Sequence, residues 1–240
     1  MLCAFASVAS ARTIYVPDDY AKIQWAVDNA SDGDTIIVRD GNYYENVVVS
    51  KKLTIKSENG SDNCIIDGGG SGTVITLNAN GITIEGFTVR NSCSYWPDVG
   101  IKVVSNANNI TYNCITNNWA GIYLNSSCNN NIYNNASNNS CGIGLSSSSS
   151  NTIANNIVSN NDYGIDLLDS GNNTIANNTV SSNNDYGILL ACSSINIIYI
   201  NNFINNTDQV YSYNSTNIWN SKEKITYTYN GKVYELLRKY

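Results

Sequence analysis

Apolar and polar residues alternate in short runs along most of this chain. In residues 121–124 (GIYL) and 164–167 (GIDL), isoleucine and leucine fall on one face and the residue between them on the other. That two-residue period is typical of β-strands and not of helices. A Gly-Ile pair opens such runs at spacings of 21, 21, 22 and 23 residues, at Gly100, Gly121, Gly142, Gly164 and Gly187. The chain is therefore predicted to repeat one strand-containing unit.

Asparagine repeats with the same period. Of the 42 asparagines, many fall into three columns: Asn113, Asn135, Asn156, Asn178 and Asn202; Asn117, Asn138, Asn160, Asn183 and Asn205; and Asn108, Asn130, Asn151 and Asn173. We expect an all-β fold, a right-handed parallel β-helix of about 22-residue coils with three short strands in each, stacked about 4.8 Å apart. Asparagine tolerates the left-handed backbone of sharp turns, and stacked amides can hydrogen-bond from coil to coil. The glycine before each isoleucine is expected to provide a bend.

The two ends of the chain depart from the repeat, as capping units do. Residues 18–27 are predicted to form a short helix that buries Ile23, Ala26 and Val27 and is capped by Asp18 or Asp19. Strands are expected at 35–38, 47–49, 53–56 and 64–67. Residues 222–238 predict a hairpin around Asn230-Gly231 that closes the other end.

These patterns divide the chain into four parts. Residues 1–11 (MLCAFASVASA) are expected to be a signal-peptide remnant, because a short apolar run ends in small residues. Residues 12–50 form the N-terminal cap and first strands, 51–208 the β-helix repeats, and 209–240 the C-terminal cap. No apolar run is long enough to predict a membrane-spanning helix. Ten Asn-x-Ser/Thr sequons are compatible with a glycosylated surface protein: Asn29, Asn59, Asn109, Asn125, Asn135, Asn138, Asn172, Asn177, Asn205 and Asn214.

Charge and composition narrow the possible chemistry. Only 13% of the residues are charged and the net charge is −6, which argues against binding to nucleic acid. The chain has no histidine, so a Ser-His-Asp triad, a histidine zinc site and a histidine copper site are excluded. Residues 103–221 contain no lysine, arginine or glutamate. A lyase that acts on uronates needs a base and cationic groups, and this segment has neither lysine nor arginine to serve.

The chain resembles a known family. Residues 13–91 contain TIYVPDDYAKIQWAVDNASDGDTIIVRDGNYYENVVVSKKLTIKSENG and GITIEGFTVRNS, and a later segment reads NNTIANNTVSSNNDYGILL. These segments resemble NosD-type, pectin-lyase-like β-helix proteins of secreted bacterial and archaeal chains. The resemblance implies the β-helix fold over residues 13–230 and a location outside the cell, at the cell surface or in the periplasm. It also implies three roles: carbohydrate binding, sugar hydrolysis, or service as an accessory in copper-enzyme maturation.

The one interruption of the period is the best candidate for a binding site. Residues 92–98 (SCSYWPD) form an insertion beside a predicted outward column that contains Lys102, Tyr123, Gly144 and Asp166. Loops that protrude from a regular scaffold often carry function. The expected substrate-binding residues are an aromatic platform with two polar neighbours: Tyr95, Trp96, Trp119 and Tyr123, with Asp98 and Lys102 to hydrogen-bond sugar hydroxyls.

An enzymatic alternative rests on three carboxylates. Asp162 and Asp185 occupy equivalent places in adjacent coils, about 5 Å apart by strand spacing, and Asp166 lies in the same unit as Asp162. Such a pair would suit a retaining glycosidase or a calcium site. A copied repeat whose carboxylates face water explains the same residues. Lys102 and Asp166 are three coils apart, about 14 Å, too far to act on one bond together.

The cysteines indicate no metal site. No Cys-x-x-Cys motif occurs, and the spacing of the seven cysteines does not bring thiolates together for Cu(I). Most of them are predicted to be small buried residues. We therefore expect no cofactor. The expected function is an exported, non-catalytic β-helix protein that binds glycans or acts as a cell-surface scaffold. The alternatives are a polysaccharide hydrolase or lyase that uses Asp162, Asp166 and Asp185, and a NosD-like copper accessory.

Overall fold

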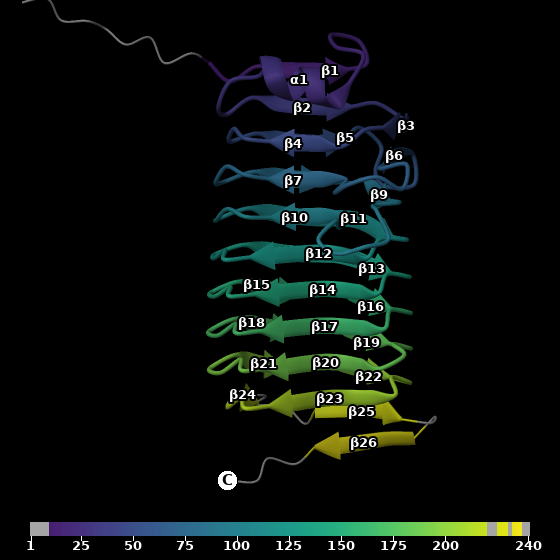
Figure 1. Cartoon of the computed structure of the whole chain (residues 1–240), viewed down its shortest axis with the longest axis vertical. Helices are drawn as coiled ribbons and strands as arrows, with labels where there is room; N and C mark the ends of the chain where they lie inside the picture. Colours follow the sequence, from purple (N-terminus) through teal and green to yellow (C-terminus); the bar gives the residue numbers. More distant parts are fainter. Residues whose placement is uncertain (1–9, 220–224, 230–231, 237–240) are drawn as a thin grey trace, which may run out of the picture.

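The computed structural model shows a stack of β-strand coils with one helix at its N-terminal end (Figure 1). It describes residues 10–219, 225–229 and 232–236. The predicted signal-peptide remnant and the Asn230-Gly231 turn thus lie almost wholly outside the described residues. No helix in the described part of the chain is long and apolar enough to cross a bilayer.

The strands form two sheets, which are parallel except for the antiparallel pair at the C-terminal end. The smaller one, sheet B, faces the viewer in Figure 1 and has eight strands. They are β4 (Val47–Val49), β7 (Ile75–Leu77), β10 (Ile101–Val103), β12 (Ala120–Asn125), β14 (Cys141–Ser146), β17 (Tyr163–Leu168), β20 (Tyr186–Ala191) and β23 (Asp208–Tyr213).

Sheet A has 18 strands in two ladders. The first ladder contains β1 (Thr13–Val16), β2 (Thr35–Val38), β5 (Thr54–Ser57), β8 (Thr83–Glu85), β11 (Asn109–Thr116), β13 (Asn131–Ser137), β15 (Thr152–Ala154), β18 (Thr174–Ala176), β21 (Ile197–Tyr199) and β24 (Ile218–Trp219). The second contains β3 (Gly41–Tyr44), β6 (Cys64–Asp67), β9 (Thr88–Arg90), β16 (Ile157–Ser159), β19 (Thr179–Ser181), β22 (Asn202–Ile204), β25 (Ile225–Tyr229) and β26 (Lys232–Leu236). The long strands β11 and β13 pair in both ladders and join them.

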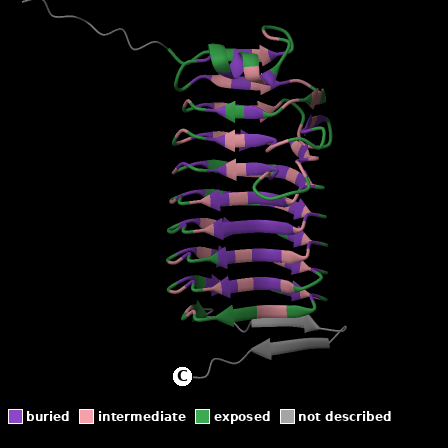
Figure 2. Cartoon of the chain, viewed as in Figure 1, coloured by how far each residue is buried: buried purple, intermediate pink, exposed green. Residues whose placement is uncertain are grey.

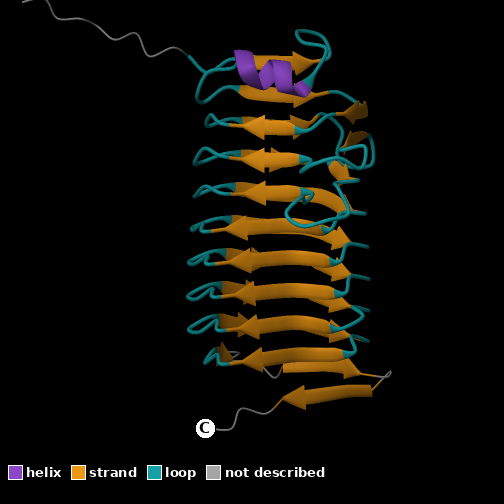
Figure 3. Ribbon diagram, viewed as in Figure 1, coloured by secondary structure: helices purple, strands orange, loops and turns teal. Residues whose placement is uncertain are grey.

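This arrangement confirms the predicted right-handed parallel β-helix, with three strand positions in each coil (Figure 3). Inward residues stack in register from coil to coil. The first ladder of sheet A, for example, carries an unbroken column of buried isoleucines: Ile14, Ile36, Ile55, Ile84, Ile110, Ile132, Ile153, Ile175 and Ile198. Figure 2 shows the result, with buried strands and exposed turns. The apolar core therefore runs the length of the stack.

The turns between strands are held by four ladders of buried polar residues. They are Asn108–Asn130–Asn151–Asn173–Asn196–Asn217, Asn113–Asn134–Asn156–Asn178–Asn201, Asn118–Asn139–Asn161–Asn183–Asn206 and Ser127–Ser148–Ser170–Ser193–Ser215. In a typical step, the side-chain oxygen of Asn151 accepts from the backbone N–H and the side-chain amide of Asn130, both at 2.9 Å. These bonds satisfy buried groups that would otherwise be costly.

The predicted columns are partly wrong. In the first, Asn134 and Asn201 hold the ladder positions and not Asn135 and Asn202. In the second, only Asn183 belongs to a ladder. Its other members lie one residue earlier, at exposed turn positions with positive φ angles near 55°: Asn117, Asn138, Asn160 and Asn205. Both proposed roles for asparagine occur, but in adjacent residues. Because Asn-Asn pairs recur, the period could not tell the buried member from the exposed one.

The glycines of the Gly-Ile pairs also serve another purpose than predicted. Their φ angles are not in the left-handed region, so they do not provide a bend that other residues would avoid. A Cβ on Gly142 would lie 2.6 Å from the carbonyl oxygen of Gly164 and 2.9 Å from the amide of Asn161. Glycine is required there because adjacent coils approach closely at the ladder.

The N-terminal helix α1 (Ile23–Asn29) is shorter than predicted, but it buries Ile23, Ala26 and Val27 as expected. Its cap is not Asp18 or Asp19. The Glu45 carboxylate, one coil later, accepts from the backbone N–H groups of Ile23 (3.0 Å) and Gln24 (3.1 Å). The two aspartates are engaged elsewhere, because Asp18 pairs with Arg39 and Asp19 accepts from the backbone of Tyr15.

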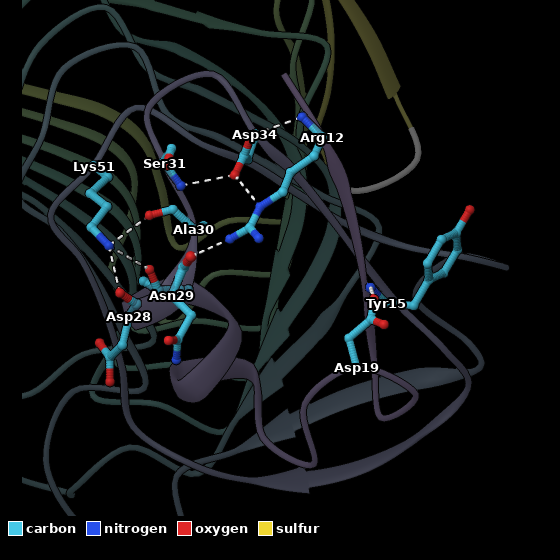
Figure 4. Close-up of polar contacts among 10 residues, drawn as sticks. Arg12, Tyr15, Asp19, Asp28, Asn29, Ala30, Ser31, Asp34 and Lys51 are labelled. Carbon is cyan, nitrogen blue, oxygen red and sulfur yellow. Dashed lines mark hydrogen bonds and ion pairs between the residues drawn. The ribbon is translucent and has the colours of Figure 1, made fainter. Parts of the chain in front are cut away.

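Polar contacts fix the other end of α1 (Figure 4). The Lys51 ammonium donates to the carbonyl oxygens of Val27, Asp28 and Ala30. Beside it, Asp34 accepts from the backbone of Ser31 and from Arg12, and these bonds hold the pKa of its carboxyl below the usual value. The helix therefore covers the open end of the stack.

The four strands predicted near the N-terminus are present. Three match residue for residue, and β5 begins one residue later than expected. At the other end, β25 and β26 pair antiparallel, which confirms the predicted hairpin. Strand β25 in turn pairs with β22 of the last coil.

The ladders generate a stability prediction. Asn156→Ala removes the acceptor of the Asn134 backbone N–H and a donor to Asn178. We expect the free energy of unfolding to fall by about 3 kcal/mol, because buried polar groups lose their partners. The control is Asn155→Gly in the same turn, where the exposed residue has a φ of 56° that glycine accepts. Urea denaturation measures both, and equal losses would contradict a special role for the ladder.

Candidate functional site

The insertion between β9 and β10 is pinned to the loop of the preceding coil. The backbone N–H of Cys93 donates to the Gly72 carbonyl at 3.1 Å. At the other end, the Thr73 hydroxyl accepts from the backbone of Val99 at 3.2 Å and donates to Asp98 at 3.5 Å. Asp98 is thus engaged within the protein, as a support for the loop and not only as a free hydrogen-bonding group. The loop stands out from the regular stack (Figure 3).

This loop places Trp96 against two aromatic residues of the neighbouring coil. The ring centroid of Trp96 lies 5.0 Å from that of Trp119 and 4.8 Å from that of Tyr123. We call these three residues the tryptophan cluster. Trp119 and Tyr123 pack on buried apolar residues outside the main core, and Trp96 remains 51% exposed. The cluster therefore combines fixed ring positions with an open ring surface.

The other predicted members of the platform are less closely joined. Tyr95 is 76% exposed and stacks on no aromatic ring among the described residues. Lys102 is half-buried on β10, directly beside Tyr123 in the sheet register. The structure thus brings Trp96, Trp119 and Tyr123 together, places Lys102 next to them, and leaves Tyr95 at the tip of the loop.

A second aromatic group on the same sheet was not predicted. Tyr163 and Tyr186 are paired on β17 and β20, and their ring centroids are 6.0 Å apart. Tyr186 in turn stacks on Tyr211 of β23 at 5.0 Å. We call these residues the tyrosine stack. The repeated Asn-Asp-Tyr-Gly-Ile segment was the available signal, since the two tyrosines it contains are one period apart.

One coil of small residues separates the two aromatic groups. The predicted outward column is confirmed, because Lys102, Tyr123, Gly144 and Asp166 are successive register partners. A Cβ on Gly144 would lie 3.1 Å from the Tyr123 ring and 3.5 Å from the Cys141 sulfur. Cys141 also belongs to the apolar cluster on which Trp119, Tyr123 and Tyr163 all pack. The outer face of sheet B is therefore one continuous surface with aromatic groups at both ends.

Asp166 lies on this face in an apolar setting. Burial raises the pKa of its carboxyl to about 6. The pKa of the neighbouring Cys141 thiol is raised well above its usual value, by burial and by the charge of Asp166. The pKa of Tyr163 is raised by burial and then by Asp185. Near neutral pH the surface thus holds one carboxyl that gains or loses a proton readily, beside groups that stay neutral.

The three carboxylates of the enzymatic alternative do not form one group. The backbone N–H of Asp185 donates to the Asp162 carbonyl at 2.9 Å, so these residues are one strand spacing apart, as predicted. The Asp162 carboxylate accepts from the side chain of Asn184 at 3.0 Å, and Asp185 is exposed. Within residues 10–219 and the two described hairpin strands, no three His, Cys, Asp or Glu side chains gather where they could hold a metal ion.

The cysteines differ from the prediction that most are buried. Of the six in the described part of the chain, Cys64 and Cys141 are buried, Cys93, Cys114 and Cys128 are half-buried, and Cys192 is exposed. None of the six forms a disulfide. Several occupy turn positions that other coils fill with serine or asparagine, which explains their exposure. Burial raises the pKa of Cys64 to about 12, so that thiol stays protonated.

Asp166 generates a pH-dependent prediction. Its pKa is about 6 in the folded protein and near 4 in an unfolded chain. The folded state therefore binds the proton more tightly, and the free energy of unfolding falls as pH rises from about 4 to about 6. Asp166→Asn should raise the free energy of unfolding by about 2 kcal/mol at pH 7 and change it little at pH 4. Denaturation at both pH values tests this, with exposed Asp169→Asn as control. An equal effect at both pH values would contradict it.

Comparison with known proteins places this architecture among β-helix proteins. The chain is 40% identical over 116 residues to a cell surface glycoprotein of Methanothermus fervidus; the match spans 47% of this chain and 18% of that protein. The chain thus spans less than a fifth of the curated relative it matches. Pectate lyase Pel9A has a TM-score of 0.59 at 13% identity, over 87% of this chain and 79% of the lyase. The periplasmic alginate epimerase AlgG has 0.55 at 20% identity, over 74% and 49%. These likenesses show the fold alone.

A family model covers most of the chain. The model described as "Periplasmic copper-binding protein (NosD)" matches residues 27–236, from inside α1 to the end of β26. This span includes every described strand except β1, together with the insertion and the polar ladders. The chain therefore belongs to the NosD family of parallel β-helix proteins.

Proposed function

We propose that this chain is an exported, non-catalytic protein that binds polysaccharide on the outer face of sheet B. The observation that carries the proposal is the pair of aromatic groups on that one face. Flat aromatic rings with a few polar neighbours suit the apolar faces and hydroxyls of sugars. The relative named a cell surface glycoprotein supports a place outside the cell, at its surface or in the periplasm.

The geometry favours a linear chain of sugars over a single one. The tryptophan cluster and the tyrosine stack belong to different coils, with the coil of Gly144 between them. A polymer that runs along the stack could contact both groups at once. The preformed ring contacts reduce the entropy lost on binding. Lys102 stands beside the tryptophan cluster and Asp166 lies on β17, the strand that carries Tyr163 of the tyrosine stack, so each can hydrogen-bond hydroxyls along such a path.

The main alternative is a polysaccharide hydrolase or lyase, and one observation favours it. A carboxyl with a pKa of about 6 suits a general acid. Such an acid needs a second group on the same bond, and Asp162 and Asp185 do not gather with Asp166 around a common point. A non-catalytic scaffold on the cell surface would share the fold and export but would need neither aromatic group.

The side chains available as copper ligands in this chain do not fit the copper role that the family description suggests. The chain has no histidine, and its single methionine is Met1. Across the described ranges the cysteines do not converge with other ligands, and the buried thiols are held protonated. Copper prefers thiolate, thioether or imidazole ligands in close geometry. The described part of this chain offers no such site.

The proposal predicts that the chain binds polysaccharide without cleaving it, and that a change in the tryptophan cluster weakens this binding. The chain should be retained on at least one member of a panel of insoluble polysaccharides, with no new reducing ends released. Trp96→Ala should weaken retention about tenfold, as expected for the loss of an exposed, preorganised aromatic anchor. Tyr44→Ala is the matched control, because Tyr44 is an exposed aromatic residue on sheet A.

Each other outcome of this assay selects an alternative. Release of reducing ends that Asp166→Asn abolishes would establish the enzyme. Retention unchanged by Trp96→Ala would move the binding surface away from the tryptophan cluster. The absence of both retention and release across the panel would leave the scaffold role.

A further inference from the structure

The turns of the β-helix create a repeated acceptor for N-linked glycans. In three places an exposed asparagine with a positive φ precedes a buried ladder asparagine, which a threonine follows. These three corner sequons start at Asn172, Asn177 and Asn205, with φ angles of 58°, 52° and 53°. Each therefore matches the Asn-x-Thr signal for glycosylation.

The fold explains why these asparagines are accessible. The middle residue of each triplet is fixed in a ladder and nearly fully buried: Asn173, Asn178 and Asn206. The first residue is thereby held at the turn, outside the core. The side-chain amides of Asn172 and Asn177 donate only to exposed residues of the preceding coil, Ser150 and Asn155. Such solvent-exposed bonds contribute little, so a substituent on the amide nitrogen disturbs no buried contact.

Asn138 and Asn214 share the exposed, positive-φ turn position but not the full Asn-Asn-Thr sequence. Two sequons at other positions in the coil are less suited. Asn135 is half-buried, and its side-chain oxygen is buried without a partner. Asn109 lies in strand β11 and accepts from the Asn131 amide. The Asn-x-Ser/Thr triplet is thus not sufficient for a good acceptor, because the position of the asparagine in the coil decides how accessible its side chain is.

The low content of charged residues also favours glycosylation. Only 13% of the residues are charged, about half the usual share for a soluble protein. Within residues 103–221 the only charged side chains are five aspartates: Asp162, Asp166, Asp169, Asp185 and Asp208. Eight of the ten sequons lie in this same segment. Glycans are bulky and solubilising, and they would supply the hydration that the missing charges do not.

We propose that Asn172, Asn177 and Asn205 carry N-linked glycans in the exported protein. In the transfer, the side-chain nitrogen of asparagine bonds to the anomeric carbon of an oligosaccharide donor linked to a lipid phosphate. The bond from that carbon to the phosphate oxygen breaks, and the amide loses one proton. None of the three residues lies in a strand of sheet B, whose outer face carries the two aromatic groups.

The test is a mass map of the protein purified from the envelope of its own cells. Trypsin cannot cut between Lys102 and Lys222, so a protease that cuts before aspartate is used. It yields fragment 169–184, which holds Asn172 and Asn177, and fragment 185–207, which holds Asn205. We expect two glycans on the first fragment and one on the second. Bare fragments, or a glycan on Asn135, would overturn the proposal.

A designed sequon tests the structural reasoning independently. Asn155 occupies the same turn position as Asn177, with a φ of 56°, but Ile157 stands where the sequon needs a hydroxyl. Ile157 pairs with Thr179 in the sheet and is 51% exposed, so Ile157→Thr copies the next coil. Expressed in the same cells, Ile157→Thr should gain the mass of one glycan. Ile157→Val, which is nearly the same shape, should gain none. No gain with threonine in a folded variant would contradict the proposed acceptor geometry.

Discussion

Hydrogen bonds from stacked asparagine and serine side chains hold the turns of this β-helix in place. A parallel β-helix must turn three times in each coil, and each turn leaves backbone groups without a strand partner. Here the side-chain oxygen of each ladder residue accepts the backbone N–H of the preceding coil, as Asn151 does for Asn130. The remaining amide protons go to the next ladder residue and to a nearby carbonyl. Turns that would be costly to bury thus become part of the packed interior.

The ladders also restrict which residues can occupy the neighbouring positions. Because consecutive coils approach closely there, the adjacent strand position must be glycine, as at Gly142. The residue before most ladder positions adopts a left-handed backbone, which favours asparagine and glycine. Isoleucine at two such positions, Ile195 and Ile200, is an exception that nothing in the described structure explains. One hydrogen-bonding arrangement therefore accounts for the composition of most turns.

The regular stack makes the irregular features easier to interpret. Sheet B presents successive coils in strict register, so aromatic residues in different coils form one surface. The insertion adds Trp96 to that surface from outside the repeat. Membership in the NosD family carries the fold, while the chain has no histidine to serve as a copper ligand. A fold of this kind does not fix a function, so the function has to be argued from a site, here the outer face of sheet B.

The repeat, the strands and the outward column from Lys102 to Asp166 can be read from the sequence, because a period near 22 residues places equivalent residues side by side. The period does not place Trp96, which lies in the insertion, and its contacts with Trp119 and Tyr123 come from the tertiary structure. The tertiary structure also shows which asparagine of each pair is buried, since adjacent residues share the period. The helix cap is Glu45 and not Asp18 or Asp19, because that contact joins residues a full coil apart. The place of Tyr211 in the tyrosine stack and the raised pKa of Asp166 likewise depend on contacts and burial that the repeat does not contain.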